Sequence, residues 1–160
     1  MTHKELVAIS CKFARKLGFP LVIPEAKSTV DEIPDVIAFR GGGDSLVIEC
    51  KVSRSDFLAD KEKPFRKEPY LGMGLYRIYV VTENVLKEGE LNLLPEGWHL
   101  IVVDSSGKPT RGTLKNISNM ALCIYRDPIT GMPILPFYDR NVYAENAVLY
   151  SYIRKNKLLK

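Results

Sequence analysis

The sequence predicts an α/β domain in which a mixed central β-sheet is flanked by helices. Apolar residues recur at helical spacing near the N-terminus, β-branched and aromatic runs alternate with turn signals through the middle, and a second helical pattern closes the chain. The chain has 160 residues, 46% hydrophobic and 26% charged, which suits one folded domain. We expect a core over residues 1–108 and a C-terminal extension, residues 109–160, that packs on it.

Composition excludes several classes of protein. No apolar run approaches the ~20 residues that span a bilayer, and the N-terminus lacks the apolar stretch of a signal peptide. Cys11, Cys50 and Cys123 are odd in number and widely spaced, which argues against a disulfide framework and for a cytoplasmic setting. Neither histidine lies near a cysteine pair, so no zinc site is expected. The net charge of +4 permits nucleic-acid binding without requiring it.

The first segment has the pattern of an amphipathic helix. Apolar side chains recur at Leu6, Ile9, Phe13 and Leu17. Thr2 and Glu5 form a capping box at its start, and Gly18 provides a stop at its end.

The remaining elements follow from local composition. We predict strands at 21–23, 35–40, 45–52, 76–82 and 98–104; a helix from Ser53 or Ser55 to about residue 62; an irregular stretch at 64–74; a short helix or turn within 84–94; a turn at 105–109; a connector at 127–136; and a helix over about 144–158. We expect Tyr138, Tyr143, Tyr150 and Tyr152 to pack this last helix against the sheet, with base stacking as the alternative.

Two strands around a glycine triplet carry the informative residues. In the second strand Leu46, Ile48 and Cys50 share one face, so Glu49 and Lys51 share the other. A carboxylate and an ammonium in the middle of an apolar strand are costly to bury unless they are paired or hold an ion. A surface ion pair on a half-exposed strand is the alternative explanation.

The hairpin register decides whether Asp35 joins this pair. If Gly41, Gly42 and Gly43 form a three-residue loop, Arg40 pairs with Asp44, and the steps inward bring Asp35 opposite Glu49. A loop one residue longer would turn Asp35 to the opposite face. Cross-strand carboxylates ~5 Å apart can share a hard cation such as Mg²⁺ or Mn²⁺. Such an ion activates water towards a phosphodiester.

These residues resemble a known nuclease motif. Pro34-Asp35, followed by Glu49-Cys50-Lys51, resembles the PD-(D/E)XK nuclease motif, and the element order is similar to the restriction-endonuclease-like core (α-β-β-β-α-β) of that superfamily. The run Glu49 to Phe57, with Asp60-Lys61 following, resembles the MmcB-like group of DNA-repair nucleases. The resemblance covers residues 1–108 and departs from the group's pattern at Lys63-Pro64-Phe65, where an aromatic residue is expected nearer to Asp60-Lys61.

The resemblance implies Mg²⁺-dependent (or Mn²⁺-dependent) hydrolysis of DNA. It assigns catalysis to Asp35, Glu49 and Lys51, and metal binding to Asp35, Glu49, the Cys50 carbonyl and Glu5 of the first helix, although Glu5 also caps that helix. Asp56 and Lys61 would lie near the cleft. We expect the DNA backbone to contact four basic residues, Arg54, Lys61, Arg66 and Lys67, with nonspecific help from the 154–160 tail.

Several alternatives remain open at this stage. The chain would serve in DNA repair, recombination or mobile-element biology. It could instead be a non-cleaving binding or inhibitor protein that keeps the nuclease fold, such as a phage or plasmid accessory, or an RNA-processing nuclease. A homodimer would place two sites on opposite strands of a duplex, and a protein partner could supply specificity. No membrane association is expected.

Overall fold

Six strands form one mixed sheet in the part of the chain that the computed structural model describes, residues 1–112 and 139–158. The strands follow the chain order across the sheet: β1 (Leu21–Pro24), β2 (Val36–Phe39), β3 (Ser45–Lys51), β4 (Tyr76–Thr82), β5 (His99–Val103) and β6 (Pro109–Gly112). Strands β1, β2 and β3 pair antiparallel, β3, β4 and β5 pair parallel, and β6 pairs antiparallel with β5. The predicted mixed α/β class is therefore confirmed.

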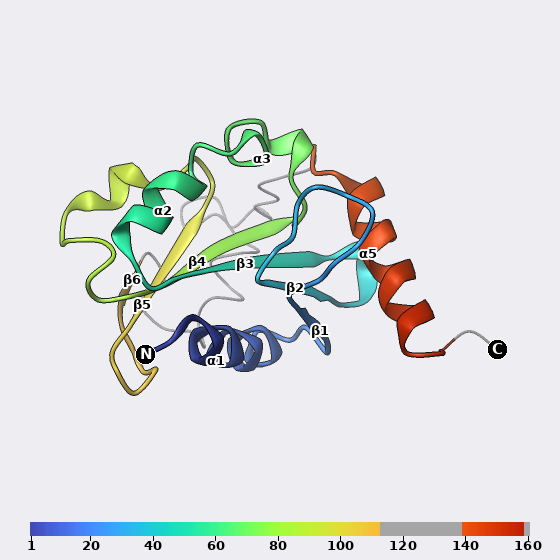
Figure 1. Ribbon diagram of the computed structural model, residues 1–160, viewed down its shortest axis with the longest axis horizontal. Helices are drawn as coiled ribbons and strands as arrows, with labels where there is room; N and C mark the ends of the chain where they lie inside the picture. Colours follow the sequence, from blue (N-terminus) through green and yellow to red (C-terminus); the bar gives the residue numbers. More distant parts are fainter. Residues whose placement is uncertain (113–138, 159–160) are drawn as a thin grey trace, which may run out of the picture.

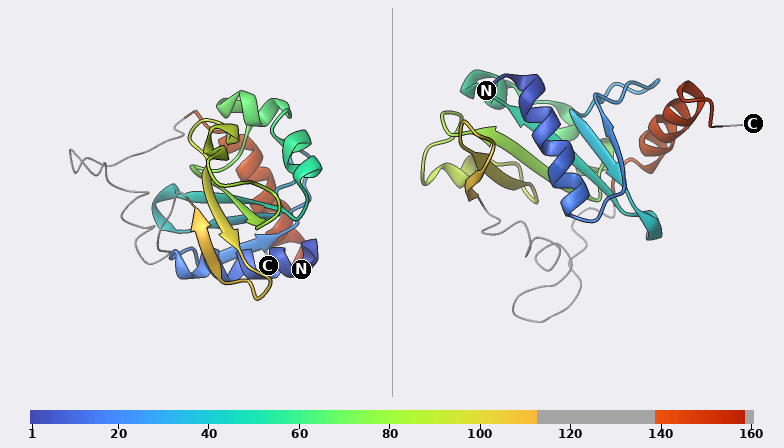
Figure 2. Two further views of the ribbon diagram at one scale, coloured as in Figure 1. Left: turned by 90° about the vertical axis from the view of Figure 1, so that its left-hand side faces the viewer. Right: turned by 90° about the horizontal axis from the view of Figure 1, so that it is seen from below.

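Helices cover both faces of the sheet (Figures 1 and 2). On one face, α1 (His3–Lys16) packs on the side chains of Ala38, Ile48 and Ile78. The opposite face carries α2 (Arg54–Asp60), α3 (Pro64–Lys67) and α5 (Val142–Lys155). Each face has its own apolar core, so alternate residues of β3 belong to different cores.

Helix α1 begins as predicted. The Glu5 N–H donates to Thr2 Oγ1 at 3.3 Å, and the Thr2 N–H donates to the Glu5 carboxylate at 2.7 Å. These two hydrogen bonds form the capping box. Gly18 follows the helix with φ of +86°, a conformation that glycine adopts at low cost.

The β2–β3 hairpin has the predicted register. The Arg40 N–H donates to the Asp44 carbonyl at 3.1 Å, and Val36 lies opposite Ile48. Gly42 and Gly43 have φ of +84° and +82°, the conformation that a three-residue loop requires. One step beyond the strand pair, this register brings Asp35 to the level of Glu49.

Two elements differ from the sequence prediction. The stretch expected to be irregular contains α3, which begins at Pro64; proline favours a first helical turn, and the Glu68 N–H closes that turn on the Pro64 carbonyl at 2.8 Å. The predicted turn at 105–109 is followed directly by β6, whose sequence Pro-Thr-Arg-Gly lacks strand alternation. Pairing with β5 forms this strand. The predicted connector at 127–136 lies outside the described residues.

Helix α5 attaches the C-terminal extension to the core. The Glu145 carboxylate, 4% exposed, accepts hydrogen bonds from Ser45 Oγ (2.6 Å), the Gly74 N–H (2.8 Å) and Arg140 Nε (3.0 Å). Ala144 and Val148 are buried in the apolar core beneath.

The tyrosines of the extension do not all pack inward. Tyr143 and Tyr150 are 78% and 58% exposed, so the expectation that they pack α5 against the sheet is wrong for these two. Tyr152 does pack against the core, and Tyr138 lies outside the described residues. No described helix has the length and apolar character that crossing a membrane requires.

Candidate active site

The three predicted catalytic residues meet at one end of the β2–β3 hairpin. Glu49 and Lys51 project from the same face of β3 and are 2% and 5% exposed. Lys51 Nζ donates to Glu49 Oε2 at 3.1 Å and lies 4.0 Å from Asp35 Oδ2. The pair is therefore buried, which excludes the surface ion pair that the sequence left open.

A backbone N–H and a histidine side chain hold the Asp35 carboxylate at the site. The Cys50 N–H donates to Asp35 Oδ2 at 2.7 Å, and His3 Nε2 lies 3.2 Å from Asp35 Oδ1. The Cys50 side chain points to the other face, where its Sγ lies 3.2 Å from Ser10 Oγ. Burial raises the pKa of the Cys50 thiol, so this cysteine is an inert core residue whose contribution to the site is its backbone.

Lys51 is surrounded by carboxylates. Asp60 Oδ1 and Asp56 Oδ2 lie 3.3 Å and 3.9 Å from its ammonium, in addition to Glu49 and Asp35. Burial by itself would lower the pKa of Lys51, but the negative charges of Glu49 and Asp60 outweigh burial and hold this pKa above its ordinary value. Lys51 is therefore a permanent cation at neutral pH.

Arg66 is the centre of a buried ion cluster, and it does not face solvent as a DNA-binding residue. Its guanidinium is 1% exposed and lies 2.6 Å from Glu32, 2.7 Å from Glu49 and 2.9 Å from Asp60. The expectation that Arg66 holds a DNA backbone is thus corrected. Arginine suits this role because its planar fork pairs with several carboxylates at once.

The cluster shifts the acidities of its carboxyl groups in opposite directions. Burial raises the pKa of Glu49 to about 7, although Arg66 and Lys51 work against the shift. Burial would also raise the pKa of Asp60, but Arg66 and Lys51 hold this pKa below its ordinary value. The Tyr79 hydroxyl adds a hydrogen bond to Asp60 at 2.7 Å.

The other predicted binding residues lie around the site with different partners. Arg54 pairs with Glu90 at 2.6 Å, and Lys67 pairs with Glu62 at 2.6 Å. Lys61 follows α2, is partly exposed, and has no ion pair with the described residues. The Glu5 carboxylate is exposed and engaged in the capping box. Its role as a metal ligand remains a prediction.

Carboxylates outnumber basic side chains at the site. Lys63 Nζ also lies 2.7 Å from Asp60 Oδ1. The ion pairs of the site therefore join five carboxylates to three basic side chains, without counting His3: Glu32, Asp35, Glu49, Asp56 and Asp60 against Lys51, Lys63 and Arg66. Glu49 Oε1 is buried and pairs with Arg66 Nη2 at 2.7 Å.

The ligands would be few. Among the described residues there is no group of three or more His, Cys, Asp or Glu side chains arranged to hold a metal ion. Mg²⁺ in proteins commonly binds through one or two carboxylates and keeps several waters. Asp35, Glu49 and the Cys50 carbonyl are the predicted ligands of such an ion.

Sequence reasoning gave no role to three residues of the site, His3, Glu32 and Asp60, although Asp60 belongs to the run that resembles the MmcB-like group. Asp60 had a local signal, because Asp56 and Asp60 are four residues apart and share a face of α2, directly after the Glu-x-Lys strand. His3 and Glu32 had no such signal. Their partners Asp35 and Arg66 are distant in the sequence, and only the fold brings them together.

Comparison with known proteins identifies a fold and no family. Neither a protein-family model nor a curated protein matches the chain. A solved structure, the SPO1766 protein of unknown function from Silicibacter pomeroyi, is similar with a TM-score of 0.55 and 21% identity, over 99% of this chain and 92% of that one. At this identity the likeness supports the mixed α/β fold with its flanked sheet, and it says nothing about activity.

Proposed function

We propose that this protein hydrolyses phosphodiester bonds of DNA with Mg²⁺ or Mn²⁺. The observation that carries the proposal is the hairpin register, which brings Asp35 to the level of Glu49 with Lys51 Nζ 3.1 Å from one carboxylate and 4.0 Å from the other. The order α1-β1-β2-β3-α2-α3-β4 differs by the added α3 from the order α-β-β-β-α-β that the motif implies, and this similarity also supports the proposal.

Asp35, Glu49 and the Cys50 carbonyl would hold the cation. A divalent ion there would polarise the phosphodiester and lower the pKa of an attacking water. Asp35 is kept in place by the Cys50 N–H and by His3, so the pair of carboxylates is arranged before any ion or substrate arrives. Such preorganisation lowers the cost of binding charge.

Lys51 acts as an electrostatic stabiliser and not as a base. Its pKa is held above the ordinary value by Glu49 and Asp60, so it keeps its proton at neutral pH. A protonated ammonium donates hydrogen bonds to the phosphate oxygens that gain negative charge in the transition state. To do so it must turn from the carboxylates that now surround it, of which Asp56, at 53%, is the most exposed.

The proposal is tested by DNA cleavage in Mg²⁺ and in EDTA, with single-stranded, nicked and duplex substrates and an RNA of the same sequence. Wild type should cleave DNA only with the metal, and Asp35→Asn should not. Asp31→Asn is the matched control, since Asp31 is an exposed aspartate in the same segment. Cleavage by purified Asp35→Asn at the wild-type rate refutes the proposal, and faster cleavage of RNA redirects it to RNA processing.

A specific observation favours one other function. Lys51 and Arg66 already neutralise Glu49, with Nζ at 3.1 Å and Nη2 at 2.7 Å, so the site is stable with its own cations in place. This arrangement also suits a nuclease-fold protein that binds without cleaving. Calorimetric titration with Mn²⁺ distinguishes the two, because a binding protein of this kind needs no metal at Asp35.

A further inference from the structure

We infer that the outer face of α5 and the groove beside it form a binding surface for single-stranded DNA, which leads the strand towards Asp35. This inference rests on the proposed function and specifies its substrate. It concerns residues that the candidate active site does not use.

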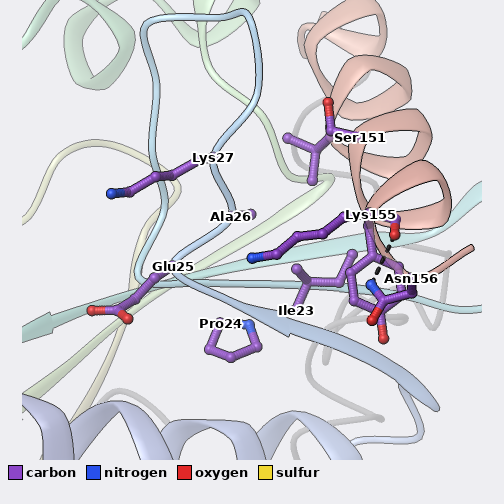
Figure 3. Close-up of a pocket in the computed structure, with 10 residues that line it drawn as sticks. Ile23, Pro24, Glu25, Ala26, Lys27, Ser151, Lys155 and Asn156 are labelled. Carbon is purple, nitrogen blue, oxygen red and sulfur yellow. Dashed lines mark hydrogen bonds between the residues drawn. The ribbon is translucent and has the colours of Figure 1, made fainter.

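The groove lies between α5 and the segment that follows β1 (Figure 3). Its cavity is about 520 Å³ and is lined from one side by residues 23–27 and from the other by Val148, Ser151, Tyr152, Lys155 and Asn156. A second open cavity of about 420 Å³ lies between Thr29 and the outer side of α5, and Ser151 lines both. We refer to these two cavities, which share Ser151, as the trough.

The outer face of α5 carries two exposed tyrosines in one row. Tyr143, Ala147, Tyr150 and Arg154 are spaced four, three and four residues apart, which places them on one side of a helix. Tyr143 and Tyr150 are 78% and 58% exposed and line the second cavity. Exposed aromatic rings beside an open cavity are platforms on which bases stack, and they tolerate any base sequence.

The charges around the trough complement a phosphate backbone. Lys27, Arg154, Lys155 and Lys157 are exposed, and none has an ion pair with the described part of the chain. Figure 3 shows the Lys155 amine pointing into the groove from α5, whereas Lys27 lies on the facing wall with its amine directed away from α5. Of the ten residues that line this cavity, Glu25 is the single acid.

The wall of the groove is joined to the candidate active site. The Glu25 N–H donates to the Asp35 carbonyl at 2.8 Å, one step beyond the pairing of Pro24 with Val36. A strand in the groove would therefore pass beside the segment that carries Asp35. A duplex presents its bases only at their edges, so stacking on Tyr143 and Tyr150 requires single-stranded DNA.

The test is fluorescence anisotropy with labelled oligothymidylate in EDTA, so that binding is measured without cleavage. We expect the double variant Tyr143→Ala, Tyr150→Ala to bind at least about thirtyfold more weakly than wild type, since each stacked base contributes about 1 kcal/mol or more. Tyr143→Phe and Tyr150→Phe should bind normally, since the rings remain. Tyr70→Ala is the control, because Tyr70 is an exposed tyrosine (55%) that lines neither cavity.

Two further arms separate stacking from charge. An abasic oligomer of equal length should bind equally to wild type and to the double variant. Lys155→Gln should reduce the slope of log K against log salt by about 0.7, the value for one lost phosphate contact on a single strand. Circular dichroism checks that each variant is folded.

Several outcomes overturn the inference. The inference fails if the double variant binds oligothymidylate as well as wild type, or if Tyr70→Ala loses as much binding affinity as the double variant. It also fails if wild type binds the matching RNA or duplex more tightly than the single-stranded DNA. Conversion of a dimer to a monomer by the double variant would make this face a contact between two copies of the chain instead. Binding without Mg²⁺-dependent cleavage supports the surface and refutes the proposed nuclease. If the double variant cleaves single strands as fast as wild type, the proposed nuclease is supported and the binding surface is refuted.

Discussion

The Asp35 carboxylate accepts a hydrogen bond from the Cys50 N–H at 2.7 Å, and this contact links the start of β2 to the end of β3. Cys50 stands between Glu49 and Lys51 in the motif. The contact therefore places Asp35, a predicted metal ligand, directly beside the other two members of the motif. Because the donor is a backbone group, the contact depends on the hairpin register and not on the Cys50 side chain. The Gly41–Gly43 loop, which sets that register, is thus part of the construction of the site.

Arg66→Met should lower the free energy of unfolding by about 3–5 kcal/mol, because the substitution leaves Glu32, Glu49 and Asp60 without their shared buried cation. Urea denaturation measures the difference. Lys67→Met is the control, since the Lys67–Glu62 pair is exposed and its loss should leave the midpoint unchanged. Equal midpoints for Arg66→Met and wild type would mean that the cluster has no role in stability.

Glu145→Ala should also be destabilising, by about 1–3 kcal/mol, because Ser45 Oγ and the Gly74 N–H lose their buried acceptor. The same substitution at exposed Glu96 should have no effect on thermal unfolding. Hydrogen exchange should show faster exchange across α5 in Glu145→Ala. If the amides of α5 exchange as slowly in Glu145→Ala as in wild type, the helix is attached to the core by Ala144 and Val148 instead.

Stability should depend on pH through Asp60. Arg66 and Lys51 hold the pKa of folded Asp60 below the ordinary value near 3.8, so the unfolded chain takes up this proton first as the pH falls. The stabilisation is complete above about pH 5 and is lost as the pH falls through the folded pKa. Asp60→Asn should therefore be less stable than wild type at pH 7, and the difference should shrink below pH 4. A difference that is constant from pH 7 to pH 3 would contradict the assigned ion pairs.

Mg²⁺ should raise the melting temperature of wild type. An ion that binds only the folded state adds about 2.7 kcal/mol at a hundred times its Kd. Asp35→Asn should lose the shift, and Asp31→Asn should retain it. Differential scanning calorimetry with and without EDTA measures both. An equal shift in Asp35→Asn would place the ion elsewhere.

Local signals predicted the elements whose stability is local. Thr2 and Glu5 cap α1, and the glycine triplet sets the β2–β3 register, so both could be inferred from neighbouring residues. The two-residue periodicity of a β-strand likewise predicted that Glu49 and Lys51 lie on the same face of β3.

The rest depends on contacts that are distant in the sequence. Arg66 lies in a short basic stretch, typical of a solvent-facing turn, and it becomes buried because Glu32 reaches it from 34 residues away. Strand β6 has no strand pattern of its own and forms by pairing with β5. The exposure of Tyr143 and Tyr150 likewise depends on which side of α5 meets the sheet, which Ala144, Val148 and Glu145 decide.

The most direct test of the active site separates metal binding from chemistry at Lys51. Lys51→Met removes the ammonium and keeps Asp35 and Glu49, so Mg²⁺ should still bind by calorimetry. Single-turnover cleavage of DNA should be at least about a hundredfold slower than in wild type, and Lys108→Met, an exposed lysine elsewhere, should cleave normally. Cleavage by folded Lys51→Met at the wild-type rate would contradict the catalytic role of Lys51.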